Sequence, residues 1–298
     1  MVVAGQRIIP VRPCDWGKPH RFWPIGDIHF GARGCDKERL QATVRAIADD
    51  PHARWVGMGD YFDMILADDK RFDPTDFDPD MEIADLGDAG NVAVEIGRTE
   101  FGPIRDKCLG LLMGNHEKKG GKGVSIIVKA LCGKHALNVP FLGYCAIFDI
   151  IYYRTGRWPA QHGLRIAAHH GAGAAQTPGG KLNRVKRFSQ SFDADIYLYG
   201  HIHARLDDES VTLGADKDCL KLVEESKIII STGTYLRTYA HSADGASGYG
   251  EVKQYDPTPL GSPCIEIVPA TGDVSVSKPS NPLHWRINRA EAIACRQA

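Results

Sequence analysis

Six short apolar runs, four of them followed directly by glycine, limit what this chain can fold into. They are Phe22–Ile25, Trp55–Met58, Leu111–Met113, Leu164–Ala168, Ile196–Tyr199 and Ile228–Ile230. Runs of this length between turn-forming residues are typical of buried strands. Stretches with helical character separate them, at about 36–49, 82–108, 123–132 and 180–192, and Asp36 is a favourable N-cap for the first. The alternation of strands and helices predicts an α/β fold.

The length of 298 residues, of which 43 % are hydrophobic, is enough for a substantial core. Because no linker is long enough to divide the chain, we predict a single domain over 1–298. We expect an acidic surface insertion near 68–90, where the Asp-rich sequence lacks the glycine and glutamate of an EF-hand loop. Proline and glycine then introduce C-terminal strands and an extension at about 250–298, including a hairpin of Cys264–Val268 and Val274–Val276.

Charge and targeting signals narrow the class of protein. The 36 basic and 37 acidic residues give a net charge of −1, which argues against a protein that coats nucleic acid but permits local action on phosphate esters. The eight cysteines are scattered without a CxxC pair, as expected for reduced thiols. Neither a signal peptide nor an apolar segment of the ~20 residues needed for a membrane span is evident. We therefore expect a soluble, cytoplasmic protein with no membrane partner.

Residue types that bind metals follow five of the apolar runs. The clusters are Asp27-Ile-His29, Asp60-Tyr-Phe-Asp63, Asn115-His116-Glu117, His169-His170 and His201-Ile-His203. Alternate residues of an extended segment share a side, so both members of Asp-x-His or His-x-His can face one site. In an open α/β sheet, ligands bind beyond the carboxyl ends of the strands. The five clusters together therefore predict one shared site, although each alone is a weak signal.

The ordered set DxH, GDxxD, GNH[DE], H and GHxH resembles that of the calcineurin-like metallophosphoesterase superfamily, over roughly Phe22 to His203. The run His169-His-Gly-Ala-Gly and the ending Tyr249-Gly-Glu-Val-Lys resemble, less specifically, the metallophosphoesterases of phages and prophages. The resemblance implies a four-layer α-β-β-α sandwich with a dinuclear metal site at the carboxyl ends of the strands.

The resemblance also implies which residues hold the two metals. The first ion would bind Asp27, His29 and His203, the second Asn115, His169 and His201, and Asp60 would bridge both. We choose His169 over its neighbour His170 because the residue directly after the strand usually takes this role. Mixed imidazole and oxygen donors favour Mn²⁺, with Fe, Zn²⁺ or Ni²⁺ as alternatives, over Ca²⁺.

The resemblance also implies catalytic roles for two further residues. His116 would protonate the leaving oxygen or stabilise the transition state, and Asp63 would orient it. The simpler alternatives are a buried, hydrogen-bonded histidine at 116 and a local turn contact at 63.

The substrate class is narrowed by a departure from the protein Ser/Thr phosphatases, which carry Arg-Gly after the second aspartate of GDxxD. Here Met64-Ile65 follow instead, so protein phosphatase activity is not expected. Candidate substrate-binding residues are His170, Lys181, Arg184 and Arg237, with a solvated helix face as the alternative for the basic stretch around Lys181.

The resemblance thus implies a phosphodiesterase, for example a nuclease, that uses a metal-bridging hydroxide as the nucleophile. Its substrate would be a phosphodiester such as single-stranded DNA or a nucleotide. The alternatives are a phosphomonoesterase acting on a small phosphorylated substrate, and a metal-binding accessory module without catalysis. The sequence does not reveal the oligomeric state.

Overall fold

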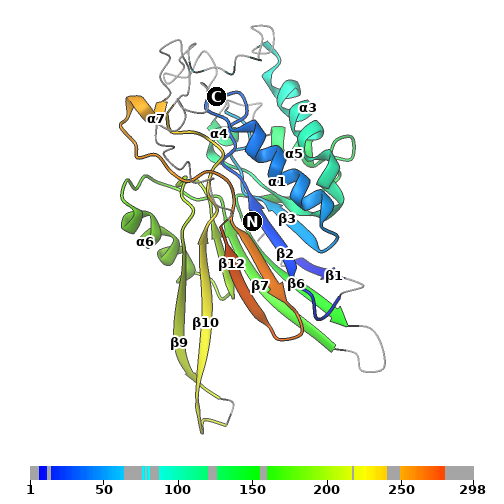
Figure 1. Cartoon of the computed structure of the whole chain (residues 1–298), viewed down its shortest axis with the longest axis vertical. Helices are drawn as coiled ribbons and strands as arrows, with labels where there is room; N and C mark the ends of the chain where they lie inside the picture. The colour runs from blue at the N-terminus through cyan, green and yellow to red at the C-terminus, as the bar shows by residue number, and fades with distance from the viewer. Residues whose placement is uncertain are drawn as a thin grey trace, which may run out of the picture.

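The computed structural model describes residues 7–11, 15–63, 76, 78, 80, 87–119, 126–154, 160–216, 218–239 and 249–278. The fold is mixed α/β, with two six-stranded mixed sheets and helices packed on them (Figure 1). The predicted α/β class is therefore confirmed, and each of the six predicted apolar runs coincides with a strand.

The first sheet has the strand order β12-β11-β2-β3-β4-β5. Four of its strands run parallel: β2 (His20–Ile25), β3 (Ala53–Gly57), β4 (Cys108–Leu112) and β5 (Phe141–Gly143). The antiparallel hairpin of β11 (Cys264–Val268) and β12 (Asp273–Ser277) adds to the β2 edge, which confirms the predicted hairpin. The carboxyl ends of β2, β3 and β4 therefore meet at one rim.

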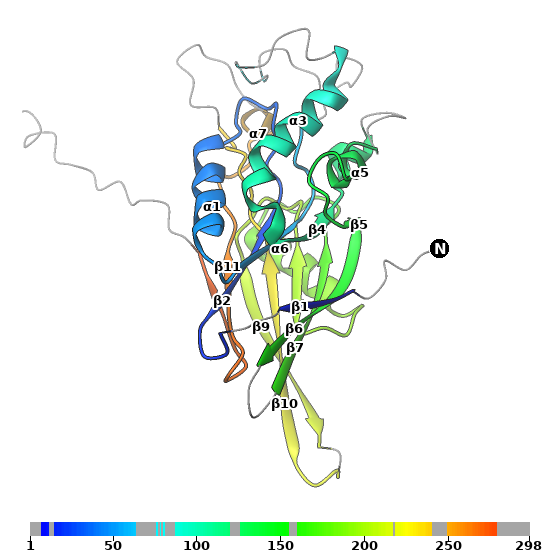
Figure 2. The same ribbon diagram turned by 90° about the vertical axis from the view of Figure 1, so that its right-hand side faces the viewer.

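The second sheet has the order β1-β6-β7-β8-β10-β9. Its strands are β1 (Arg7–Val11), β6 (Cys145–Arg154), β7 (Ala160–His169), β8 (Ile196–Tyr199), β9 (Asp207–Ala215) and β10 (Leu222–Ser231). β7, β8 and β10 are parallel neighbours, whereas β6 and β9 pair antiparallel on either side of them. The β9–β10 hairpin extends well beyond the body of the molecule (Figures 1 and 2).

The helices are α1 (Lys37–Asp49), α3 (Ala89–Phe101), α4 (Asn115–Lys119), α5 (Ile127–Cys132), α6 (Pro178–Ser189) and α7 (Tyr249–Val252). Asp36 caps α1 as predicted, because its side chain accepts a hydrogen bond from the Arg39 N–H at 3.1 Å. The helix expected at 82–108 begins at Ala89 and continues as a 3₁₀ helix over Gly102–Lys107, and residues 82–86 lie outside the described residues.

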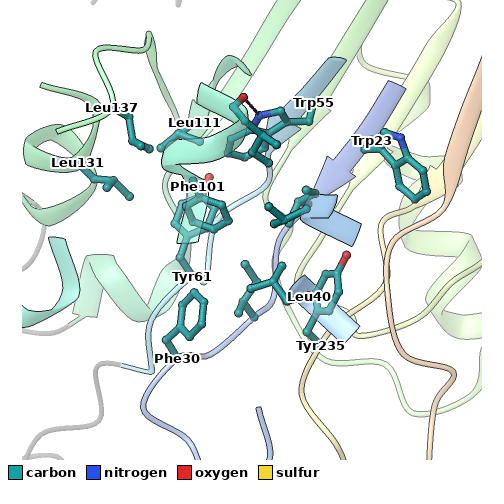
Figure 3. Packing of buried hydrophobic residues seen from close by; sticks show 14 of the residues in the cluster. Trp23, Phe30, Leu40, Trp55, Tyr61, Phe101, Leu111, Leu131, Leu137 and Tyr235 are labelled. Carbon is teal, nitrogen blue, oxygen red and sulfur yellow. Dashed lines mark hydrogen bonds between the residues drawn. The ribbon is translucent and has the colours of Figure 1, made fainter. Parts of the chain in front are cut away.

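Three groups of buried side chains hold these elements together. Helices α1, α3 and α5 pack on one face of the first sheet, where Trp55, Leu111 and Phe101 lie in one cluster (Figure 3). Trp55 Nε1 donates to the Ile104 carbonyl at 2.8 Å, so the buried indole keeps a hydrogen bond. On the second sheet, α6 packs through Val185 and neighbouring apolar residues.

The third group, here called the inter-sheet core, joins the two sheets. It combines side chains of β2, β3, β4 and β11 with side chains of β6, β7, β8 and β10, among them Phe22, Val56, Leu112, Phe148, Ile166, Leu198 and Ile265. Nearly all of these side chains are fully buried. The sheets therefore face one another across an apolar layer, and the two sets of strand ends are brought to the same region.

Two predicted segments, the acidic insertion and the C-terminal extension, are described only in part. Most of the acidic insertion near 68–90, and the extension after residue 278, lie outside the described residues, so the single domain stays a prediction. Within the described part, Asp78 is buried and pairs with Lys37 at 2.7 Å. No helix among the described residues combines the length and hydropathy of a membrane span, and the six cysteines described there form no disulfide.

The inter-sheet core predicts a strong dependence of stability on its aliphatic side chains. We expect Ile166→Ala to lower the free energy of unfolding by about 2–5 kcal/mol, because it removes buried apolar surface and leaves a cavity. Leu213→Ala, on the exposed β9–β10 hairpin, should change it by less than about 0.5 kcal/mol. Urea unfolding of both variants measures this, and equal losses would contradict the assigned core.

Candidate metal centre

Backbone hydrogen bonds hold the segments after β2 and β3 against one another. Asp27 N donates to Gly59 O at 2.9 Å, and Ile28 N donates to Asp60 O at 2.8 Å. His29 N makes a second bond to Asp60 O at 3.1 Å. The parallel pairing of the strands thus continues past their ends, and it fixes Asp27 and His29 beside Asp60.

The same segments carry an unusual concentration of left-handed backbone. Five of the eight described non-glycine residues with positive φ are predicted ligands, with φ between 46° and 69°: Asp27, His29, Asp60, His201 and His203. Such conformations are uncommon outside glycine and persist only where the surrounding structure enforces them. A methyl group on Gly114 would overlap the Asp60 carboxylate, so close approach also requires glycine there. Contacts with neighbouring segments, and not only the backbone preferences of these residues, therefore set the geometry of this rim.

A first group of metal-binding atoms comprises Asp27, His29 and His203. His203 Nε2 lies 3.2 Å from His29 Nε2 and 3.4 Å from Asp27 Oδ1. The Asp27 carboxylate is held in place by the His201 N–H, at 2.9 Å from Oδ2 and 3.1 Å from Oδ1. Asp27 and His29 are buried, whereas the His203 side chain is 30 % exposed and marks the open side of the group.

A second group comprises Asp60, His170 and His201. His170 Nε2 lies 3.3 Å from Asp60 Oδ2 and 3.1 Å from Asn115 Oδ1, which brings the amide oxygen into the same group. A further set of converging atoms, from His29, Asp60 and His116, connects the two groups. Asp60 thus lies between them, in the position expected for a bridging carboxylate.

The structure places the predicted ligand His169 outside these groups of converging atoms. Its Nδ1 accepts a hydrogen bond from Gly171 N at 2.7 Å, and its ring stacks on Tyr199 with centroids 5.7 Å apart. His170, not His169, joins Asp60 in the second group.

Strand pleating explains why the neighbours differ. In β7, Ile166 and Ala168 face the inter-sheet core, whereas Ala167 lies among the residues packed under α6. Side chains alternate along a strand, so His169 falls on the α6 side and His170 returns to the inner side. A hydrogen bond of 2.8 Å between His170 Nδ1 and Met58 O holds the ring on that side. The period-two pattern of β7 is the sequence signal that distinguishes the two histidines.

The donor atoms fit a bound cation. His201 Nδ1 is buried and has no hydrogen-bond partner among the described residues. Burial lowers the pKa of His201 to about 4, which favours the neutral imidazole that metals require. Burial alone would raise the pKa of the Asp60 carboxyl, but the charge of His170 and its hydrogen bond outweigh that effect and keep Asp60 ionised. Burial would lower the pKa of His170, but Asp60 in turn raises it to about 9, so a metal bound by His170 would displace its proton. Imidazoles, carboxylates and an amide oxygen form a donor set that suits Mn²⁺, Fe or Zn²⁺.

His116 and Asp63 lie at the edge of this centre as a pair. His116 Nδ1 is 2.7 Å from Asp63 Oδ1, and the same oxygen is 3.6 Å from His29 Nδ1. Burial would raise the pKa of Asp63, but the contacts with His116 and His29 lower it overall. A carboxylate on Nδ1 fixes the tautomer and the orientation of the imidazole. The pair thus has the contact expected of an oriented proton donor.

The contacts of Arg184 and Arg237, two of the predicted substrate-binding residues, are with groups other than the candidate metal ligands. Arg184 donates to Ala172 O at 3.2 Å and to Ala174 O at 2.7 Å, and so supports the loop after His170. Arg237 pairs with Asp36 at 3.0 Å, at the start of α1. Burial lowers the pKa of Lys181, and the charge of Asp256 opposes that shift.

Two residues that contact the ligand segments were not among the predicted site residues. Thr234 Oγ1 donates to Asp27 O at 2.8 Å, from the segment after β10. Glu117 is fully buried beside Asp60, and burial together with the charge of Asp60 raises its pKa to about 7. The glutamate of the GNHE motif was visible in the sequence, but nothing in the sequence indicated its contacts.

No protein-family model matches this chain, and a search of curated proteins finds no significant match. The chemistry of the site is therefore inferred from its own residues.

The two adjacent histidines provide a direct test of the ligand set. We expect Mn²⁺ to raise the melting temperature of the wild-type chain, because a ligand at about 100 times its Kd stabilises the folded state by about 2.7 kcal/mol per site. His170→Ala should lose the Mn²⁺ ion of the second group, whereas His169→Ala should keep it. Isothermal titration gives the stoichiometry of each variant. The assignment would be contradicted if His169→Ala lost an ion and His170→Ala kept both.

Proposed function

We propose that this chain is a dinuclear metal-dependent phosphoesterase of the calcineurin-like type that hydrolyses phosphodiester bonds. The observation that carries the proposal is the pair of donor groups with Asp60 between them. The fold is consistent with it, because an inter-sheet core lies between two sheets that each carry helices, as a four-layer α-β-β-α sandwich requires.

In this proposal Asp27, His29 and His203 would hold one ion, and Asn115, His170 and His201 would hold the other. Asp60 would contribute to both sites. A pair of divalent ions held there would lower the pKa of a bound water and stabilise the charge that develops in an in-line displacement. Because only Asp27 and Asp60 contribute negative charge to the ligand set, the loaded site stays positive and attracts a phosphate ester.

His116 is proposed to deliver a proton to the leaving oxygen. Asp63 supports this role by holding Nδ1, so that the ring keeps one orientation while the other nitrogen carries the transferred proton. The His116–Asp63 pair also distinguishes the proposal from a metal-binding module without catalysis, which has no need of an oriented imidazole.

A diester is favoured over a monoester by the charges around the site. A phosphomonoester carries a second negative charge, which enzymes commonly neutralise with arginine. Of the basic residues predicted to bind substrate, Arg184 and Arg237 are both engaged by other groups. A diester, such as a single-stranded DNA linkage or a nucleotide diester, carries one negative charge and so requires fewer neutralising cationic side chains than a monoester does.

The proposal is tested by hydrolysis in the presence of Mn²⁺. We expect turnover of bis-p-nitrophenyl phosphate and of single-stranded DNA to exceed turnover of p-nitrophenyl phosphate. Asp60→Asn should abolish turnover, because the shared carboxylate is lost. Diester turnover no higher than that of Asp60→Asn would contradict the proposal, and a large excess of monoester turnover would favour a phosphomonoesterase.

The role of His116 makes a separate prediction. His116→Ala should lower kcat by about 10²–10⁴-fold for a diester with a poor leaving group, as expected for loss of a general acid. The loss should be much smaller for a p-nitrophenyl ester, whose leaving group needs little protonation. Equal losses on both substrates in steady-state assays would assign His116 to another role.

A further inference from the structure

The Glu117 side chain is a buried carboxylate that is bonded by four backbone N–H groups. Oε1 accepts from Tyr61 N at 2.6 Å and Phe62 N at 3.3 Å. Oε2 accepts from Asp60 N at 3.1 Å and Gly114 N at 2.9 Å. The residue has no exposed surface, so each of these bonds is shielded from water.

These four bonds join two segments that are distant in the sequence. Three donors, the N–H groups of Asp60, Tyr61 and Phe62, belong to the segment after β3, and the fourth belongs to the turn between β4 and α4. Helix α4, which follows this turn, also contacts the Asp60 side chain, because His116 N donates to Asp60 Oδ1 at 2.9 Å. Glu117 therefore holds the backbone of Asp60, and the His116 N–H group holds its carboxylate.

The bonds also assign Glu117 to a supporting role rather than to metal coordination. Each oxygen already accepts two backbone hydrogen bonds. The side chain thus works through Asp60, whose left-handed backbone, with φ of 50°, needs support from its surroundings.

We infer that Glu117 is a positioning residue that holds Asp60 in the orientation needed to share two cations. This inference rests on the metal centre of the proposed function. It predicts that loss of the Glu117 carboxylate weakens metal binding even though Glu117 contacts no metal. Outer residues that orient metal ligands typically change metal affinity by about 10–100-fold.

The test is Mn²⁺ affinity measured by titration calorimetry on the full chain. Glu117→Gln keeps the size of the side chain but places an amide NH₂ against backbone N–H donors. We expect its Mn²⁺ affinity to fall by about 10–100-fold at a temperature where circular dichroism shows a folded protein.

Asp50→Asn is the matched control, because Asp50 accepts a bond from His52 N at 2.8 Å at the other end of β3. Its Mn²⁺ affinity should equal that of the wild-type chain. An affinity of Glu117→Gln no lower than that of Asp50→Asn overturns the inference. If the wild-type chain itself binds no Mn²⁺, the proposed function fails, and the inference fails with it.

A measurement on the wild-type chain covers the case in which Glu117→Gln does not fold. Hydrogen exchange should show strong protection of the amides of Asp60, Tyr61, Phe62 and Gly114, and Mn²⁺ should slow their exchange further. Exchange of these four amides at the rate of open loops, or exchange that does not respond to bound Mn²⁺, overturns the inference.

Discussion

Burial of two carboxylates at neighbouring strand ends is the constraint on which the arrangement of this site depends. Asp27 and Asp60 are almost completely shielded from water, and like charges in such surroundings are costly unless other groups compensate. The compensation is local: the His201 N–H holds Asp27, and the His116 N–H and the His170 ring hold Asp60. Bound cations would complete it, and the converging imidazoles supply the remaining ligands.

The fold makes this arrangement possible by bringing two sheets to one rim. β2, β3 and β4 deliver Asp27, Asp60 and Asn115, whereas β7 and β8 of the second sheet deliver His170 and His201. The inter-sheet core fixes the distance between these sets. Stability and function are therefore linked, because a change in the core that shifts one sheet also separates the donors.

The strands, the C-terminal hairpin and the cap at Asp36 could be predicted because each depends on nearby residues. The choice between His169 and His170 depends on which face of β7 is buried, and a motif read alone does not carry that information. Glu117 acts through backbone donors more than fifty residues away, at Asp60, Tyr61 and Phe62, so no local pattern reveals its contacts. The metal ligands, and the catalytic roles of His116 and Asp63, remain predictions that the geometry supports.

The proposed sharing of Asp60 by two cations can be tested by anomalous diffraction. Crystals grown with Mn²⁺, measured at the manganese absorption edge, should show two peaks on either side of the Asp60 carboxylate. One peak should contact His29 and His203, and the other should contact His170 and His201. A single peak, a peak bound by His169, or no peak near Asp60 would contradict the account.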